Sequence, residues 1–153
     1  MPAKRRAYES TSVSVDKSRA SIAKVLVAWG ATGIAWEDDL RTGAATLRFR
    51  WCPGDDDREL VARLRLVPSV PVTNTEKQAA AALERDRRRL HRVAFHWLKA
   101  QHEAVEAGLF DATTVVMPWL EDSTGRTLGE TVRPALAGLA SIDVGRRLAL
   151  TGK

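Results

Sequence analysis

Arginine is the residue type with the clearest chemical meaning in this chain, because its planar guanidinium donates paired hydrogen bonds to phosphate or carboxylate oxygens. Residues 75–109 carry many such groups at helical spacing, about 100° of rotation per residue. One face collects Arg85, Arg88, Arg89, Arg92, His96 and Lys99, and the opposite face collects Leu83, Leu90, Ala94, Trp97, Leu98, Gln101 and Val105. The pattern predicts one long helix, about 50 Å in length, that packs by its apolar face and presents cations to an anionic partner.

Two predicted strands, residues 45–51 and 60–67, add four more arginines. The apolar residues of these strands alternate with Arg48 and Arg50 in the first and with Arg63 and Arg65 in the second. Like charges directly opposite each other destabilise a strand pair. We therefore expect these arginines to be staggered, paired with acids or available to an anionic ligand, and to face away from the helices.

The other reactive residue types form no recognisable catalytic or metal-binding pattern. His91, His96 and His102 are not spaced by the three or four residues that place two imidazoles on one helix face, so we expect them to be solvated. The acidic runs at 37–39 and 55–57 lie in turns at opposite ends of a strand, about 20 Å apart. They cannot share a two-metal site and are expected to be solvated too. The sequence therefore predicts no catalytic residue, no metal, no cofactor and no enzymatic activity.

Composition is consistent with a single globular domain. The chain has 153 residues, 44% of them hydrophobic, and 24 Lys and Arg against 19 Asp and Glu, for a formal net charge of +5. Such a balance is typical of nucleic-acid-binding proteins, but it is also common in Arg-rich proteins of high-GC genomes that have no such role. The single cysteine, Cys52, excludes an intramolecular disulfide. No apolar run approaches the ~18 residues of a membrane span, so we expect a cytoplasmic protein without membrane contact.

The hydrophobic periodicities predict an α+β fold. Residues 10–15 alternate as a strand, and Asp16 is expected to cap a helix that runs to Trp29 and stops at Gly30. Strands at 33–36, 45–51 and 60–67 precede the long helix, which begins with a capping-box signature at Thr75 and Gln78. Short helices follow Asp111 and Thr127. The predicted order is strand, helix, three strands, long helix and short C-terminal helices, with two helices on one face of an antiparallel meander.

This order divides the chain into a basic flexible tail at 1–9, one domain at 10–140 and a C-terminal tail at 141–153. Trp29, Trp51 and Trp97 fall on apolar faces and are expected in the core. For Trp36 and Trp119 the sequence leaves both a core position and an exposed position open. If the first half of the long helix projects beyond the sheet, its apolar face stays exposed, and self-association into a homo-oligomer would cover it.

A set of short stretches spread over most of the chain carries a resemblance to known proteins: Tyr8, residues 11–15, Ser18, Arg19, Ile22, Leu26, residues 30–33, 103–108, 117–120 and 125–127, Gly129 and Glu130. In these stretches the chain resembles a family of small, mostly uncharacterised proteins of actinobacteria and their phages. The resemblance implies a phage or prophage setting, in which small basic proteins serve DNA metabolism or interfere with host enzymes.

We therefore expect a non-enzymatic accessory protein that binds nucleic acid, single-stranded or duplex, without sequence preference. Its contacts are predicted to be Arg85, Arg88, Arg89, Arg92 and Lys99 on the helix and Arg48, Arg50, Arg63 and Arg65 on the sheet. The alternative is a small protein modulator whose basic face docks on an acidic surface of a host or defence enzyme. Nuclease-treated lysate separates the two, because only a protein partner survives that treatment.

Overall fold

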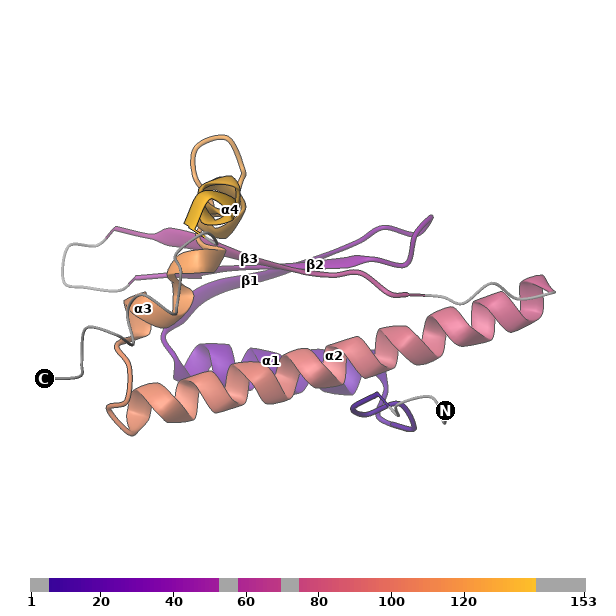
Figure 1. Cartoon of the computed structure of the whole chain (residues 1–153). Coiled ribbons are helices and arrows are strands. Elements are labelled where there is room, and N and C mark those ends of the chain that lie inside the picture. Colours follow the sequence, from indigo (N-terminus) through magenta and orange to yellow (C-terminus); the bar gives the residue numbers. More distant parts are fainter. Residues whose placement is uncertain (1–5, 53–57, 70–74, 140–153) are drawn as a thin grey trace, which may run out of the picture.

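The computed structural model describes residues 6–52, 58–69 and 75–139 of the chain. Its elements follow the order helix, three strands, long helix, short helix, 3₁₀ turn and helix (Figure 1). They are α1 (Val15–Ala28), β1 (Ala31–Asp38), β2 (Ala45–Trp51), β3 (Leu60–Leu66), α2 (Glu76–Glu106), α3 (Ala112–Val116), η1 (Met117–Trp119) and α4 (Leu128–Leu139). The α+β class and the antiparallel three-stranded meander expected from the sequence are confirmed. The predicted tail at 141–153 lies outside the described residues.

The strand predicted at residues 10–15 is wrong. Residues 11–14 are irregular and belong to no sheet, and Val15 already begins α1. The N-cap is Ser14 rather than Asp16, because the Ser14 hydroxyl accepts a hydrogen bond from the Lys17 amide at 3.3 Å. Alternation over six residues was too short to distinguish a strand from an extended segment that leads into a helix cap.

The register of the sheet separates an apolar face from a basic face. Leu47 lies opposite Trp36 and Leu64, and Phe49 lies opposite Ile34 and Ala62. Residues paired in this way point to the same side of an antiparallel sheet. This side faces α1 and α2 (Figure 1), whereas the four strand arginines point to the opposite side, as expected.

The core lies between the sheet and this pair of helices. Its largest fully buried apolar side chains come from α1, β2 and α2, with Ile22, Leu26, Leu47 and Leu98 at 0 to 1% exposure. Trp51 is also buried, and Trp29 and Trp97 are half-buried against the same cluster, so the predicted core positions of these tryptophans are confirmed. Leu98 and Trp97 thus make their apolar contacts within one copy of the chain.

The long helix is continuous over its 31 residues, which corresponds to about 46 Å. Thr75 is its N-cap and accepts a hydrogen bond from the Gln78 amide at 3.2 Å, as predicted. Gly108 follows its end with a φ of +72°, in the left-handed region that favours glycine. Because α1 has only 14 residues, it lies beside the later part of α2 and leaves the first turns without a helical neighbour (Figure 1).

The C-terminal elements bring the chain to the far face of the sheet. Asp111 caps α3, and Thr127 with Glu130 forms a complete capping box at α4, in which each side chain accepts a hydrogen bond from the other residue's amide. Between them, Leu120 bridges Ala62 of β3. The helix α4 therefore lies beside β3, across the sheet from α1 and α2 (Figure 1).

Truncating the buried helix contact tests this packing. Leu98→Ala should lower the free energy of unfolding by about 2–5 kcal/mol, because it removes transfer free energy and leaves a cavity. Leu40 is 94% exposed, so Leu40→Ala should change it by less than about 0.5 kcal/mol. Urea denaturation measures both. Equal effects would contradict the described core.

Candidate nucleic-acid interface

The basic residues predicted on α2 differ in their exposure and in how they are neutralised. Arg88 and Lys99 make loose contacts with Glu84 and Glu103, at 3.8 and 3.5 Å. Arg85 is exposed and Arg92 lies 4.7 Å from the centre of the Phe95 ring. Neither Arg85 nor Arg92 forms an ion pair with any carboxylate in the described part of the chain. These two guanidiniums are therefore available to bind an external anion.

Arg89 is different, because it belongs to a buried contact that sequence reasoning missed. Its Nε lies 2.6 Å from Asp86, whose side chain is only 2% exposed. Asp86 also accepts a hydrogen bond from the Ser69 amide at 2.7 Å and lies 3.3 Å from Arg6. These hydrogen bonds and ion pairs hold the pKa of Asp86 below its ordinary value, against the opposing effect of burial. Asp86 thus joins α2, the N-terminal segment and the segment after β3. Arg89 neutralises this carboxylate and is not available to an external anion.

The N-terminal segment adds an aromatic surface beside the free arginines. Residues 6–9, within the predicted tail, contact α2, and the Tyr8 ring stacks on His96 with centroids 4.7 Å apart and planes 3° from parallel. Tyr8 is 43% exposed. Desolvation, with Arg92 and Lys99 nearby, lowers the pKa of His96. The outer face of α2 therefore combines cations with a stacked, partly exposed ring pair, and we call these residues the α2 face: Tyr8, Arg85, Arg88, Arg92, His96 and Lys99.

Most of the sheet arginines are paired with acids. Arg48 and Arg63 are direct neighbours in the register, so their charges need compensation. Glu121 lies 3.2 Å from both of them, Glu37 lies 2.9 Å from Arg48, and Glu130 lies 2.6 Å from Arg63. The hydrogen bonds from Arg48 to Glu37 and Glu121 raise the pKa of its guanidinium. An alternating chain of five charges thus crosses the sheet from β1 to α4.

The two remaining sheet arginines lie on either side of this chain. Arg50 crosses over Gly33, where an added Cβ would lie 2.6 Å from its Nε, and reaches Glu59 at 3.4 Å. Arg65 is exposed and makes no ion pair with the described residues. Of the four predicted sheet contacts, only Arg65 remains free for an external anion.

A second cluster of side chains joins the helices to the sheet and changes two expectations. Arg19 of α1 donates paired hydrogen bonds to Asp38 at 2.6 and 3.0 Å, and Arg87 of α2 donates to the same carboxylate at 3.2 Å. Arg19 also donates to Nε2 of His91, which is 1% exposed. Asp38 therefore ends β1 and is ion-paired, although it stays exposed, and His91 is a buried helix residue rather than a solvated one.

The hydrogen bonds of His91 define its tautomer. Since Nε2 accepts from Arg19 at 3.2 Å, Nδ1 carries the proton and donates to the Arg87 carbonyl at 2.8 Å. Burial lowers the pKa of this imidazole. Trp36 packs on it at 5.2 Å with Arg19 over the indole at 4.4 Å, so Trp36 belongs to this cluster. Trp119 packs edge-on against Trp97.

The described residues contain neither a cluster of metal-ligating side chains nor a membrane-spanning helix. Within 6–52, 58–69 and 75–139, no group of three or more His, Cys, Asp or Glu side chains could hold a metal ion. No helix in the same residues is long and apolar enough to cross a bilayer. The acidic run predicted as a turn at 55–57 lies outside them.

Comparison with known proteins adds no further constraint. No family model, curated protein or solved structure matches this chain. A function is therefore argued from the charge and geometry of the described residues.

The neutral state of His91 makes folding dependent on pH. Because its pKa is lowered by folding, the stabilisation is complete above the ordinary value of 6.5 and is lost as pH falls from there toward the folded-state pKa. Protonation would break the Arg19 hydrogen bond and add a cation beside Arg19 and Arg87, which the nearby Asp38 only partly offsets. We expect the free energy of unfolding to fall by up to about 1.4 kcal/mol per pH unit below that value.

Urea denaturation between about pH 5 and pH 8 measures this loss. His91→Gln, which retains a donor and an acceptor, should flatten the profile. His96→Gln controls for the second histidine with a lowered pKa. A His91→Gln profile as steep as that of the parent protein would contradict this assignment.

The charge chain on the sheet gives a separate prediction. Glu121→Gln should lower the free energy of unfolding by about 1–3 kcal/mol, because Arg48 and Arg63 would then face each other without their shared carboxylate. The Glu121 side chain is 12% exposed. Glu106→Gln, at an exposed position on α2, should change stability by less than about 0.5 kcal/mol. Thermal or urea unfolding of both variants checks the difference.

Proposed function

We propose that this protein is a non-enzymatic accessory protein that binds nucleic acid through the α2 face. The observation that carries the proposal is the position of Arg85 and Arg92. Both guanidiniums lack a carboxylate partner in the described residues and lie on the same helix face as the exposed Tyr8–His96 stack.

The charges of this face favour phosphate contact. Phosphate oxygens accept hydrogen bonds from arginine and lysine whatever the base sequence, and contacts of this kind release counterions. Arg88 and Lys99 support the two free arginines, because their ion pairs at 3.5 to 3.8 Å are long and partly or fully exposed, and such pairs contribute little to stability. A phosphate can replace such a carboxylate at small cost.

The aromatic pair favours a polynucleotide over a simple anion. Proteins that bind single strands without sequence preference combine basic grooves with rings on which bases stack. One side of the Tyr8 ring lies against His96, and the residue remains 43% exposed. The sequence resemblance to actinobacterial and phage proteins is the ground for placing this binding in the DNA metabolism of a mobile element.

Compared with the set expected from the sequence, the proposed contact surface is smaller. Arg89 is excluded because it neutralises the buried Asp86. Arg48 and Arg63 are excluded because they share Glu121 at 3.2 Å, and Arg50 because it pairs with Glu59 on the side of the sheet away from α2. Arg65 has no carboxylate partner in the described residues, but it lies on the side of the sheet that faces away from α2. The proposed phosphate contacts are therefore the four on α2, namely Arg85, Arg88, Arg92 and Lys99.

A charge-neutralising triple variant tests the proposal. Arg85→Gln with Arg92→Gln and Lys99→Gln should weaken binding to labelled DNA and RNA oligonucleotides by about tenfold or more. It should also reduce the slope of log affinity against log salt by about two to three, since each lost phosphate contact removes roughly 0.7–0.9. Fluorescence polarisation at several salt concentrations measures both quantities for single strands and duplexes.

The matched control removes three charges elsewhere. Arg41→Gln with Arg58→Gln and Arg126→Gln changes exposed arginines outside the α2 face and should leave the affinity and most of the salt slope intact. Equal losses in the two triple variants would show that net charge alone drives binding. No binding to any oligonucleotide would refute the proposal and favour the alternative partner, an acidic surface of a host or defence enzyme.

A further inference from the structure

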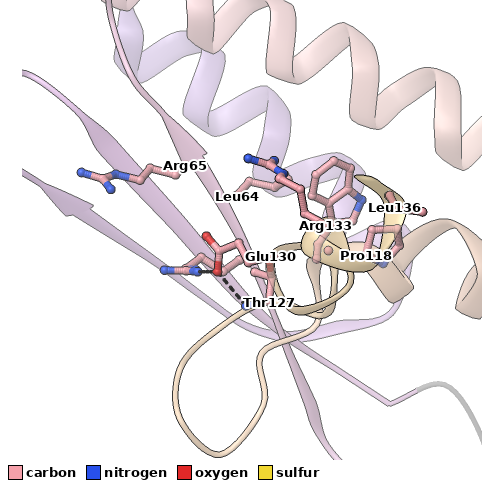
Figure 2. Close-up of a pocket in the computed structure, with 10 residues that line it drawn as sticks. Leu64, Arg65, Pro118, Thr127, Glu130, Arg133 and Leu136 are labelled. Carbon is pink, nitrogen blue, oxygen red and sulfur yellow. Dashed lines mark hydrogen bonds and ion pairs between the residues drawn. The ribbon is translucent and has the colours of Figure 1, made fainter. Parts of the chain in front are cut away.

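The hollow between β3 and α4 lies at the outer edge of the sheet, and no residue of the α2 face lines it. It has a volume of about 430 Å³. Its walls come from β3, η1 and α4, and Figure 2 draws the lining residues as sticks. Leu64, Pro118, Trp119 and Leu136 provide apolar surface, and Arg63, Arg65 and Arg133 provide charge.

The hollow borders a partly unpaired edge of the sheet. β3 is an outer strand of the sheet, and only its first half is covered, where the Glu121 amide donates to the Val61 carbonyl at 2.8 Å and Leu120 bridges Ala62. The 3₁₀ turn η1 then carries the chain away. Because backbone groups alternate in direction along a strand, Arg65 points its N–H and C=O the same way as Val61, toward the hollow. No backbone hydrogen bond from the described residues reaches Arg65 from that side.

The charges at this edge are not balanced. Three arginines line the hollow against one carboxylate, Glu130, which already accepts hydrogen bonds from Arg63 at 2.6 Å and from the Thr127 amide at 2.9 Å. Arg65 and Arg133 reach no carboxylate of the described residues (Figure 2). The unmet charge is therefore positive and lies on both walls, one arginine on β3 and one on α4.

We propose that this edge binds an extended peptide in which acidic and apolar residues alternate. A strand added beside β3 forms main-chain hydrogen bonds with Arg65, the usual mode of strand addition at an open edge. Its side chains alternate between the two faces of the sheet. Those on the basic face meet Arg65 and Arg133 and must be acidic. Those on the other face meet Leu64 and Trp119 and must be apolar.

Two other occupants fit less well. Pairing with β3 of a second copy would bring the Arg63 and Arg65 side chains of both copies together without added acids, which is unfavourable. A nucleic-acid strand would satisfy Arg65 and Arg133 but would leave the apolar walls at Leu64, Pro118 and Leu136 and the free edge without matching groups. The charges, the apolar walls and the free strand edge of the hollow therefore favour an extended peptide that carries both acidic and apolar side chains.

A fluorescein-labelled peptide of alternating glutamate and valine, seven residues long and blocked at both ends, is the probe. It should bind the full chain in a polarisation assay, and Arg65→Gln with Arg133→Gln should weaken binding by about tenfold. Hydrogen exchange at the Arg65 amide should slow when the peptide binds, because that amide gains a hydrogen-bond acceptor. The Arg41→Gln and Arg126→Gln double variant, matched in charge, should bind like the parent protein.

Three results would overturn the proposal. They are no binding in the millimolar range, equal binding of a peptide whose central residues are proline and cannot form the strand ladder, and binding unaffected by the Arg65 and Arg133 changes. The triple variant at Arg85, Arg92 and Lys99 should keep its peptide affinity, and the variant at Arg65 and Arg133 should keep its oligonucleotide affinity. Loss of oligonucleotide binding in the latter would assign the hollow to nucleic acid instead. These cross-comparisons keep a failure at this edge separate from a failure at the α2 face.

Discussion

The paired hydrogen bonds between Arg19 and Asp38 hold the two layers of the molecule in their relative position. The apolar core between helices and sheet is not directional, so it does not by itself fix how the layers are aligned. The Asp38 carboxylate connects the end of β1 to both helices, because Arg19 comes from α1 and Arg87 from α2. His91 and Trp36 complete the packing around these charges. The position of α2, and with it the cations on its outer face, depends on this cluster.

Arginine has two separate roles in this chain, and burial with local partners decides between them. Arg63 and Arg89 lie on carboxylates that are themselves largely enclosed, those of Glu121 and Asp86, where an unpaired charge would be costly. Arg85, on the exterior of α2, and Arg65 and Arg133, beside the β3 edge, reach no carboxylate of the described residues. A high arginine content alone therefore does not identify a binding surface. The informative residues are those whose charge is left after the internal pairs are counted.

Local patterns in the sequence were sufficient for much of the fold. Alternation around Leu47 and Phe49 gave the correct strand faces, and the capping residues Thr75, Asp111 and Thr127 were recognised because their partners lie within three residues. The contacts of Asp86 with Arg6 and of Arg19 with His91 were missed, because each joins positions more than 70 residues apart. One signal was present but not used: continuing the alternation of Ile34 and Trp36 places Asp38 on the helix side of the sheet. Pairing of the strand arginines with acids was one of the expected outcomes, but Glu121 could not be identified without the tertiary structure.

The Asp86 contact also affects the order in which the molecule can assemble. Arg6 can form its ion pair only after Asp86, 80 positions later, has been synthesised, and Tyr8 can stack only after His96 has been synthesised. A ribosome therefore releases this segment long before its docking site exists. Contacts with such large sequence separation form late, because closing a long loop costs entropy before the contact is made. The aromatic part of the α2 face is consequently among the last surfaces of a newly synthesised chain to be completed.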